Sequence, residues 1–234
     1  VGEDYEKAVW EYIKNMSEEH TIMLTTPYDY LYSIVDAILK AVMSAGSDEE
    51  SDVLSIMNKH SYIFGEGSQD PIILARPTDL VEALNVVMDG LPGGKGRVAI
   101  PREFNTAQSL TNFIESDPVL KELVVKGRDK NANTSRFVTH FIITRDTPTV
   151  IEHAKAGRVA EARGLIACIK KKICEELSEM ISKGEIQVNC AGVSCQEGKN
   201  ESDKITSIEA KQVSALSENP RVVRPGCPTI GSAE

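Results

Sequence analysis

Apolar residues recur at helical spacing through much of the first ninety residues of this 234-residue chain. Between residues 28 and 45 they fall on one stripe, at Leu31, Ile34, Val35, Ile38, Leu39 and Val42. Spacing by three and four residues is the signature of an amphipathic helix with one buried face. Thr26 and Pro27 precede the stripe as an N-cap and a first helical residue, and Gly46 follows it. This segment is the clearest predicted helix in the N-terminal half.

Similar patterns predict helices elsewhere, over residues 5–16, 47–59, 77–88, 105–116, 117–126, 147–157 and 158–182. Two segments are ambiguous. Ile72–Leu74 is either a strand or a buried loop, and residues 136–145 fit a helical face although their β-branched content suits a strand. We interpret residues 136–145 as helix because the segments around them are helical. The sequence therefore predicts an all-α protein with at most one or two short strands.

The net charge changes sign along the chain. Residues 1–90 carry 5 Lys/Arg and 17 Asp/Glu, residues 91–172 carry 15 and 8, and residues 173–234 carry 6 and 10. The first change coincides with the glycine-rich breaker at residues 91–97. We therefore expect an acidic helical lobe at residues 1–90, a basic helical lobe at 91–186, and a flexible or partner-ordered tail at 187–234.

The basic middle supplies the candidate binding residues, which are expected to contact an anion. They are Lys95, Arg97, Arg102, Lys121, Lys126, Arg128, Lys130, Arg136, Lys170, Lys171 and Lys172. A solvated charged face explains such a cluster equally well. If the cluster binds a partner, that partner is either a nucleic acid or an acidic protein surface, including the acidic lobe of a second copy.

No phosphate-loop, metal or cofactor motif is present. The glycine-rich segment at residues 90–97 departs from the phosphate-loop pattern, because Gly follows Lys95 where Ser or Thr is required and a predicted helix precedes it. Cys190, Cys195 and Cys227 would need a histidine to complete a zinc site, and every histidine is remote in sequence. We expect neither a metal nor a cofactor.

Five cysteines lie in the last third, and their odd number argues against a complete disulfide framework. The sequence thus predicts a reducing, cytoplasmic location, with a Cys190–Cys195 disulfide as the alternative for an exported chain. Cys168 and Cys174 are interpreted as small core residues. No apolar run approaches the roughly 18 residues that a membrane span requires.

These observations favour a non-enzymatic, self-associating structural or assembly protein whose basic middle binds an anionic partner. A nucleocapsid-like, RNA-binding role with a flexible tail fits that architecture by analogy. The first alternative is a protein–protein adaptor that does not bind nucleic acid. The second is an enzyme whose site pairs Cys168 or Cys174 with His140 or His153.

Overall fold

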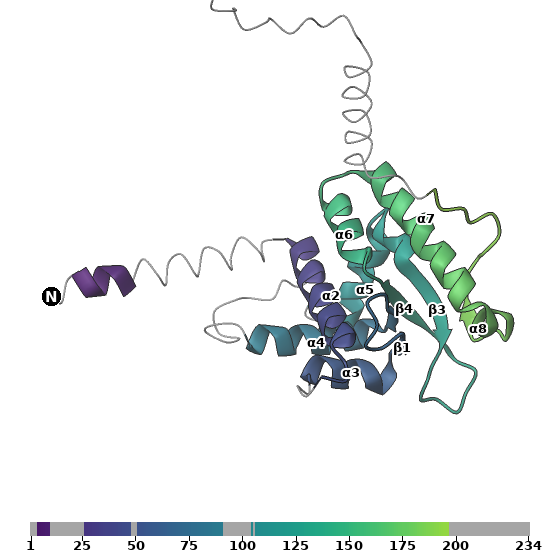
Figure 1. Cartoon of the computed structure of the whole chain (residues 1–234), viewed down its shortest axis with the longest axis horizontal. Coiled ribbons are helices and arrows are strands. Elements are labelled where there is room, and N and C mark those ends of the chain that lie inside the picture. The colour runs from purple at the N-terminus through teal and green to yellow at the C-terminus, as the bar shows by residue number, and fades with distance from the viewer. Residues whose placement is uncertain (1–3, 10–25, 48–50, 91–103, 105, 197–234) are drawn as a thin grey trace, which may run out of the picture. The chain divides into compact units, whose positions relative to one another are not determined.

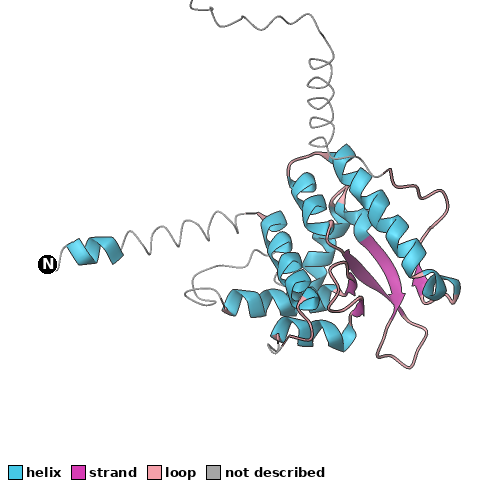
Figure 2. Ribbon diagram, in the orientation of Figure 1, coloured by secondary structure: helices cyan, strands magenta, loops and turns pink. Residues whose placement is uncertain are grey.

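Five antiparallel strands form one sheet that curls into a half-barrel, in the order β1-β2-β4-β3-β5 (Figures 1 and 2). The computed structural model describes residues 4–9, 26–47, 51–90, 104 and 106–196. The strands are Tyr62–Phe64 (β1), Ile72–Ala75 (β2), Val124–Arg128 (β3), Phe137–Ile143 (β4) and Ile186–Gln187 (β5). The protein combines helices with a sheet, so the prediction of an all-α fold is wrong.

Strand β4 accounts for most of this error. The segment at 136–145, interpreted as helix, instead pairs with β3 on one side and with β2 on the other. Its β-branched and aromatic residues suit a pleated surface that is packed on both sides. The predicted helix at 117–126 is also wrong, because only Leu120–Leu123 is helical, as the short 3-10 helix η1, before β3 begins.

The helices agree more closely with the sequence pattern. They are α2 (Pro27–Met43), α3 (Asp52–His60), α4 (Pro77–Asp89), α5 (Ala107–Ser116), α6 (Thr147–Lys155), α7 (Val159–Glu176) and α8 (Ser178–Ser182). The predicted stripe of α2 is buried, and the Thr26 hydroxyl accepts a hydrogen bond from the backbone of Asp29 while the Asp29 carboxylate accepts one from the backbone of Thr26. No helix in the described part of the chain is long and apolar enough to cross a membrane.

Ion pairs show how α7 crosses the sheet. Its Arg163 lies 3.7 Å from Glu122 in η1, and its Lys172 pairs with Asp70 in the turn between β1 and β2. The helix therefore runs from the start of β3 to the start of β2, and Figure 1 shows it on the side of β3 and β4 away from α2, α3 and α4. The buried isoleucines of α7 join the common core, at Ile166, Ile169 and Ile173.

The predicted lobe boundary at 91–97 lies outside the described residues. The sheet takes β1 and β2 from the chain before it, and β3, β4 and β5 from the chain after it. Pairing of β2 with β4 joins the two parts within one sheet.

Polar contacts hold the half-barrel in its curled form. The Tyr62 hydroxyl of β1 donates a hydrogen bond to the backbone oxygen of Arg128 at the end of β3, at 2.8 Å. In the loop that follows, Lys130 donates to the carbonyl oxygens of Asn58 and Ser61, at 3.3 and 3.4 Å. These carbonyls lie at the C-terminal end of α3, where the helix dipole favours a cation. The β3–β4 loop is thereby fixed against α3.

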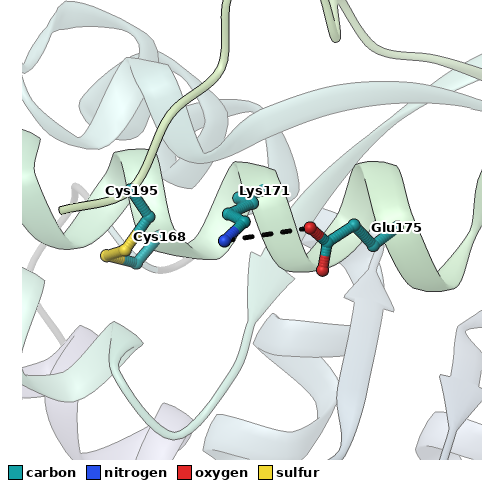
Figure 3. The surroundings of a disulfide bond; sticks show 4 residues. All are labelled: Cys168, Lys171, Glu175 and Cys195. Atoms are coloured by element: carbon teal, nitrogen blue, oxygen red, sulfur yellow. Dashed lines mark ion pairs between the residues drawn. A yellow bond between two sulfur atoms is a disulfide. The ribbon is translucent and has the colours of Figure 1, made fainter. Parts of the chain in front are cut away.

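Two disulfides fasten the segment after β5 to the outer face of α7. Cys168 is bonded to Cys195 and Cys174 to Cys190, with Cα atoms 4.6 and 5.8 Å apart. The six-residue spacing places the two helical cysteines about 120° apart around α7. Residues 190–195, which we call the strap, therefore cross the outward face of α7. Figure 3 shows Cys168–Cys195 beside Lys171 on that face.

The disulfides correct the predicted location. Such bonds form and persist in oxidising compartments and are rare in the cytosol. Because four of the five cysteines are paired, the predicted reducing, cytoplasmic environment is wrong, and the structure points to an oxidising, non-cytoplasmic one. The alternative Cys190–Cys195 pairing is also wrong, since each of these cysteines is bonded to α7. Cys227 lies outside the described residues.

Candidate functional site

The predicted anion-binding residues do not form one groove. Lys126 and Arg136 line a single pocket at the end of the sheet, whereas Lys121 in η1 and Arg128 in β3 are exposed outside it. Lys130 donates hydrogen bonds to carbonyl oxygens at the C-terminal end of α3. The remaining predicted residues of the middle segment, Lys95, Arg97 and Arg102, lie outside the described part of the chain.

The three lysines of α7 lie on a separate surface. Lys172 pairs with Asp70 and also donates a hydrogen bond to its backbone oxygen at 3.1 Å. Lys171 lies 3.9 Å from Glu175, so it is partly neutralised on the outer face that the strap crosses (Figure 3). Lys170 is half-buried on the same helix. None of the three lines the pocket that holds Lys126 and Arg136.

This pocket, which we call the polar pocket, has a volume of about 440 Å³ and lies where α4 and α5 begin against β3 and β4. Its lining residues come from four segments of the chain, two of which flank the β3–β4 turn. They are Arg76, Pro77, Thr78, Ala107, Gln108, Thr111, Lys126, Asp129, Arg136, Phe137, Val138 and Thr139.

Positive charge dominates the polar pocket. Lys126 is exposed and donates a hydrogen bond to the Thr139 hydroxyl, and Arg136 is exposed with no ion pair among the described residues. Asp129 is the one acidic residue of the lining. The first turns of α4 and α5 also face the pocket, and the N-terminal end of a helix carries partial positive charge. Two side-chain cations and two helix N-termini therefore converge on one cavity.

A buried ion pair anchors the edge of the polar pocket. Asp79 in the first turn of α4 is only 1% exposed, and its two carboxylate oxygens accept hydrogen bonds from the Arg76 guanidinium at 3.1 and 3.2 Å. The Ser61 hydroxyl donates a third bond to this carboxylate, at 3.0 Å. Because the charge of Arg76 is committed to Asp79, the cations that remain for a ligand are Lys126 and Arg136.

His140 is a buried residue of β4, the strand that pairs with β3. Its Nδ1 lies 3.0 Å from the backbone oxygen of Val138, and its Nε2 has no hydrogen-bond partner among the described residues. A Cβ atom at Gly127 would lie only 3.0 Å from the ring, so the missing side chain of Gly127 provides the space for the imidazole. Burial lowers the pKa of His140, and the charge of Arg76 adds to this effect.

We expect His140 to make the protein less stable as the pH falls below about 6.5, the usual pKa of a free histidine. In the folded state its pKa is lowered, so on acidification the unfolded chain takes up a proton before the folded chain does. The stabilisation is complete above the unfolded pKa and is lost as the pH falls towards the folded pKa. Urea unfolding between pH 7.5 and 5 measures this slope.

The variant His140→Gln should flatten that slope, whereas His60→Gln, which removes a histidine at the half-exposed end of α3, should leave it in place. Equal slopes in the wild type and in His140→Gln would contradict a role for the buried imidazole.

The structure also bears on the other predicted chemistries. Cys168 and Cys174 are in disulfides, so neither presents the thiolate that a nucleophile needs. Within the described residues, no three His, Cys, Asp or Glu side chains gather in a way that could hold a metal ion. The RNA-binding, nucleocapsid-like interpretation presupposed helical lobes around a basic region, and the mixed fold with its dispersed cations overturns it.

The sequence did not reveal Arg76 or the two helix N-termini as parts of the polar pocket. Their only sequence signals are local: Pro77 at the start of one helix, and Thr106 before the other, where its hydroxyl accepts a hydrogen bond from Ser109 N at 3.0 Å. Comparison with known protein families, with characterised proteins and with solved structures finds no match for this chain.

Proposed function

We propose that this protein is a non-enzymatic interaction protein of an oxidising environment, and that it holds an anionic group of its partner in the polar pocket. The observation that carries the proposal is the convergence of Lys126, Arg136 and the N-terminal turns of α4 and α5 on one cavity of about 440 Å³. Helix N-termini bind phosphate, sulfate and carboxylate through their backbone N–H groups.

The shape of the pocket suits a single anionic group better than an extended polyanion. A long anionic chain needs a continuous track of cations, and the predicted cations of the described chain are divided between the polar pocket, the α3 contact of Lys130 and the face of α7. A single phosphate, sulfate or carboxylate group on an acidic protein surface fits this open pocket with its two local cations. The self-association expected from the charge split stays a separate prediction.

The pocket is also held in place before any ligand arrives. The Arg76–Asp79 pair fixes the start of α4, and the capping box at Thr106 and Ser109 fixes the start of α5. Preorganised donors cost less to order on binding. The hydroxyls of Thr78 and Thr139 in the lining add neutral hydrogen-bond donors, whereas the Thr111 hydroxyl donates to the backbone oxygen of Ala107.

Replacing Lys126 and Arg136 together by glutamine should weaken the binding of inorganic sulfate by about tenfold, or about 1.4 kcal/mol. The expected loss arises because both side-chain cations of the pocket are removed while the helix N-termini remain. Binding is measured by NMR titration at low ionic strength, where the backbone amides of Thr78, Ala107 and Gln108 should shift most. Higher salt should weaken the interaction through screening.

A matched control removes two lysines outside the pocket, Lys121→Gln with Lys170→Gln, and so changes the net charge equally. This control should retain the affinity of the wild type. If the control weakens sulfate binding as much as the pocket variant does, the effect is one of net charge and the assignment of the pocket fails. Sulfate that leaves the three amides unshifted contradicts it as well.

A further inference from the structure

A second cavity, of about 380 Å³, lies between α2 and α6, which lie next to each other in Figure 1. We call it the α2–α6 groove, and it shares no lining residue with the polar pocket. Tyr28 and Tyr32, one helical turn apart on α2, line it together with the buried Ile151 of α6. Its charged residues are Asp29, Glu152 and Lys155.

One of the two tyrosines is held firmly in position. The Tyr28 hydroxyl donates a hydrogen bond to the Asp117 carboxylate, and its ring packs edge-on against Phe113 with centroids 5.2 Å apart. Burial, aided by the bond to Asp117 and by the charge of that residue, raises the pKa of Tyr28 to about 12. The phenol stays neutral at physiological pH and its hydroxyl is occupied, so Tyr28 offers a ligand its ring rather than its hydroxyl.

The charges of the groove do not cancel. Asp29 and Lys155 face each other across the two helices at 2.7 Å and neutralise one another. Glu152 is exposed in the same groove and has no ion pair among the described residues. After burial, its negative charge is the next cause that raises the pKa of Tyr32, so the carboxylate acts on the second aromatic ring of the groove. One negative charge, which acts on Tyr32, is therefore left uncompensated in the groove.

We infer that the α2–α6 groove binds a small organic ammonium compound, whose apolar part packs on Tyr28, Tyr32 and Ile151 while its cationic head lies near Glu152. Tyrosine rings attract a cation through the negative face of the π system, and quaternary ammonium groups are recognised in this way. A cavity of a few hundred cubic ångströms with mostly apolar walls and few polar groups is typical of small-molecule sites.

The test compares choline with 3,3-dimethylbutan-1-ol, which has the same shape and lacks the charge. Choline should bind more tightly by about threefold to thirtyfold, the range of a cation–π contact. NMR titration of the full chain should show shifts of the amides of Tyr32 and Glu152. Equal binding of the two probes overturns the inference, and so does the absence of binding by choline.

Two variants separate the charge from the rings. Glu152→Gln should remove most of the difference between the two probes, and Tyr32→Leu should weaken choline. Glu161→Gln, at an exposed position on α7, should leave both affinities unchanged. Far-UV circular dichroism confirms that each variant is folded. The Lys126→Gln, Arg136→Gln double variant should bind choline as the wild type does, so this inference stands or falls independently of the polar pocket.

Discussion

Replacing Asp79 by alanine should lower the free energy of unfolding by about 3 to 5 kcal/mol, the usual cost of removing one partner of a buried ion pair. The carboxylate is 1% exposed and accepts hydrogen bonds from Arg76 and from Ser61. Without it, the guanidinium of Arg76, whose side chain is only 20% exposed, keeps its charge but loses its partner. The buried Ser61 hydroxyl loses its acceptor as well.

Urea unfolding followed by far-UV circular dichroism measures this effect. The matched control is Glu82→Ala on the exposed face of the same helix, which should change the stability by less than about 0.5 kcal/mol. Asp79→Asn keeps the shape and removes the charge, so its loss should lie between those of the alanine variant and the wild type. An Asp79→Ala protein as stable as the Glu82→Ala control would show that these bonds do not hold the start of α4 against the end of α3.

The second large effect concerns the disulfides. Replacing Cys174 and Cys190 by serine should cost about 2 to 4 kcal/mol of stability. This bond closes a loop that contains α8 and β5, and the burial of Ile186 against the sheet depends on that loop. The unfolded chain gains conformational entropy, although Cys168–Cys195 still closes a longer loop around the segment, so the free energy of unfolding falls. Unfolding under non-oxidising and non-reducing conditions measures it.

Thiol counting in denaturant checks the premise. Protein made in an oxidising compartment should show one free thiol per chain, because two disulfides leave one of the five cysteines. Five free thiols in the oxidised protein would contradict both bonds and the oxidising environment inferred from them.

Replacing Cys168 and Cys195 by serine should lower the free energy of unfolding by less than replacing Cys174 and Cys190 does, since the Cys174–Cys190 bond then still holds β5.

The sequence predicted the helices well and the sheet poorly, for physical reasons. The stripe of α2 is amphipathic, and its capping residues mark its start. Strand β4 is packed between β2 and β3, and its last four residues are buried, so it lacks the alternation of a half-exposed strand. A continuous apolar run of that length cannot be told from a buried helix by periodicity.

The site could be predicted only in part. Lys126 and Arg136 were found because charge is visible in composition, and they are close in sequence across the β3–β4 turn. Arg76 joins them only because β2 pairs with β4, which brings together residues more than fifty positions apart. The disulfides could not be predicted from the spacing of the two cysteines within α7, because each of them is bonded to the strap and not to the other.

The contact of Gly127 with the His140 ring has a consequence for evolution. Since a Cβ atom at Gly127 would lie 3.0 Å from the imidazole, any side chain at position 127 requires the ring to move by a few tenths of an ångström. A side chain at position 127 is therefore accepted most easily where residue 140 is smaller than histidine. Among homologues, glycine at 127 should therefore accompany a large ring at 140 more often than a residue with a side chain does.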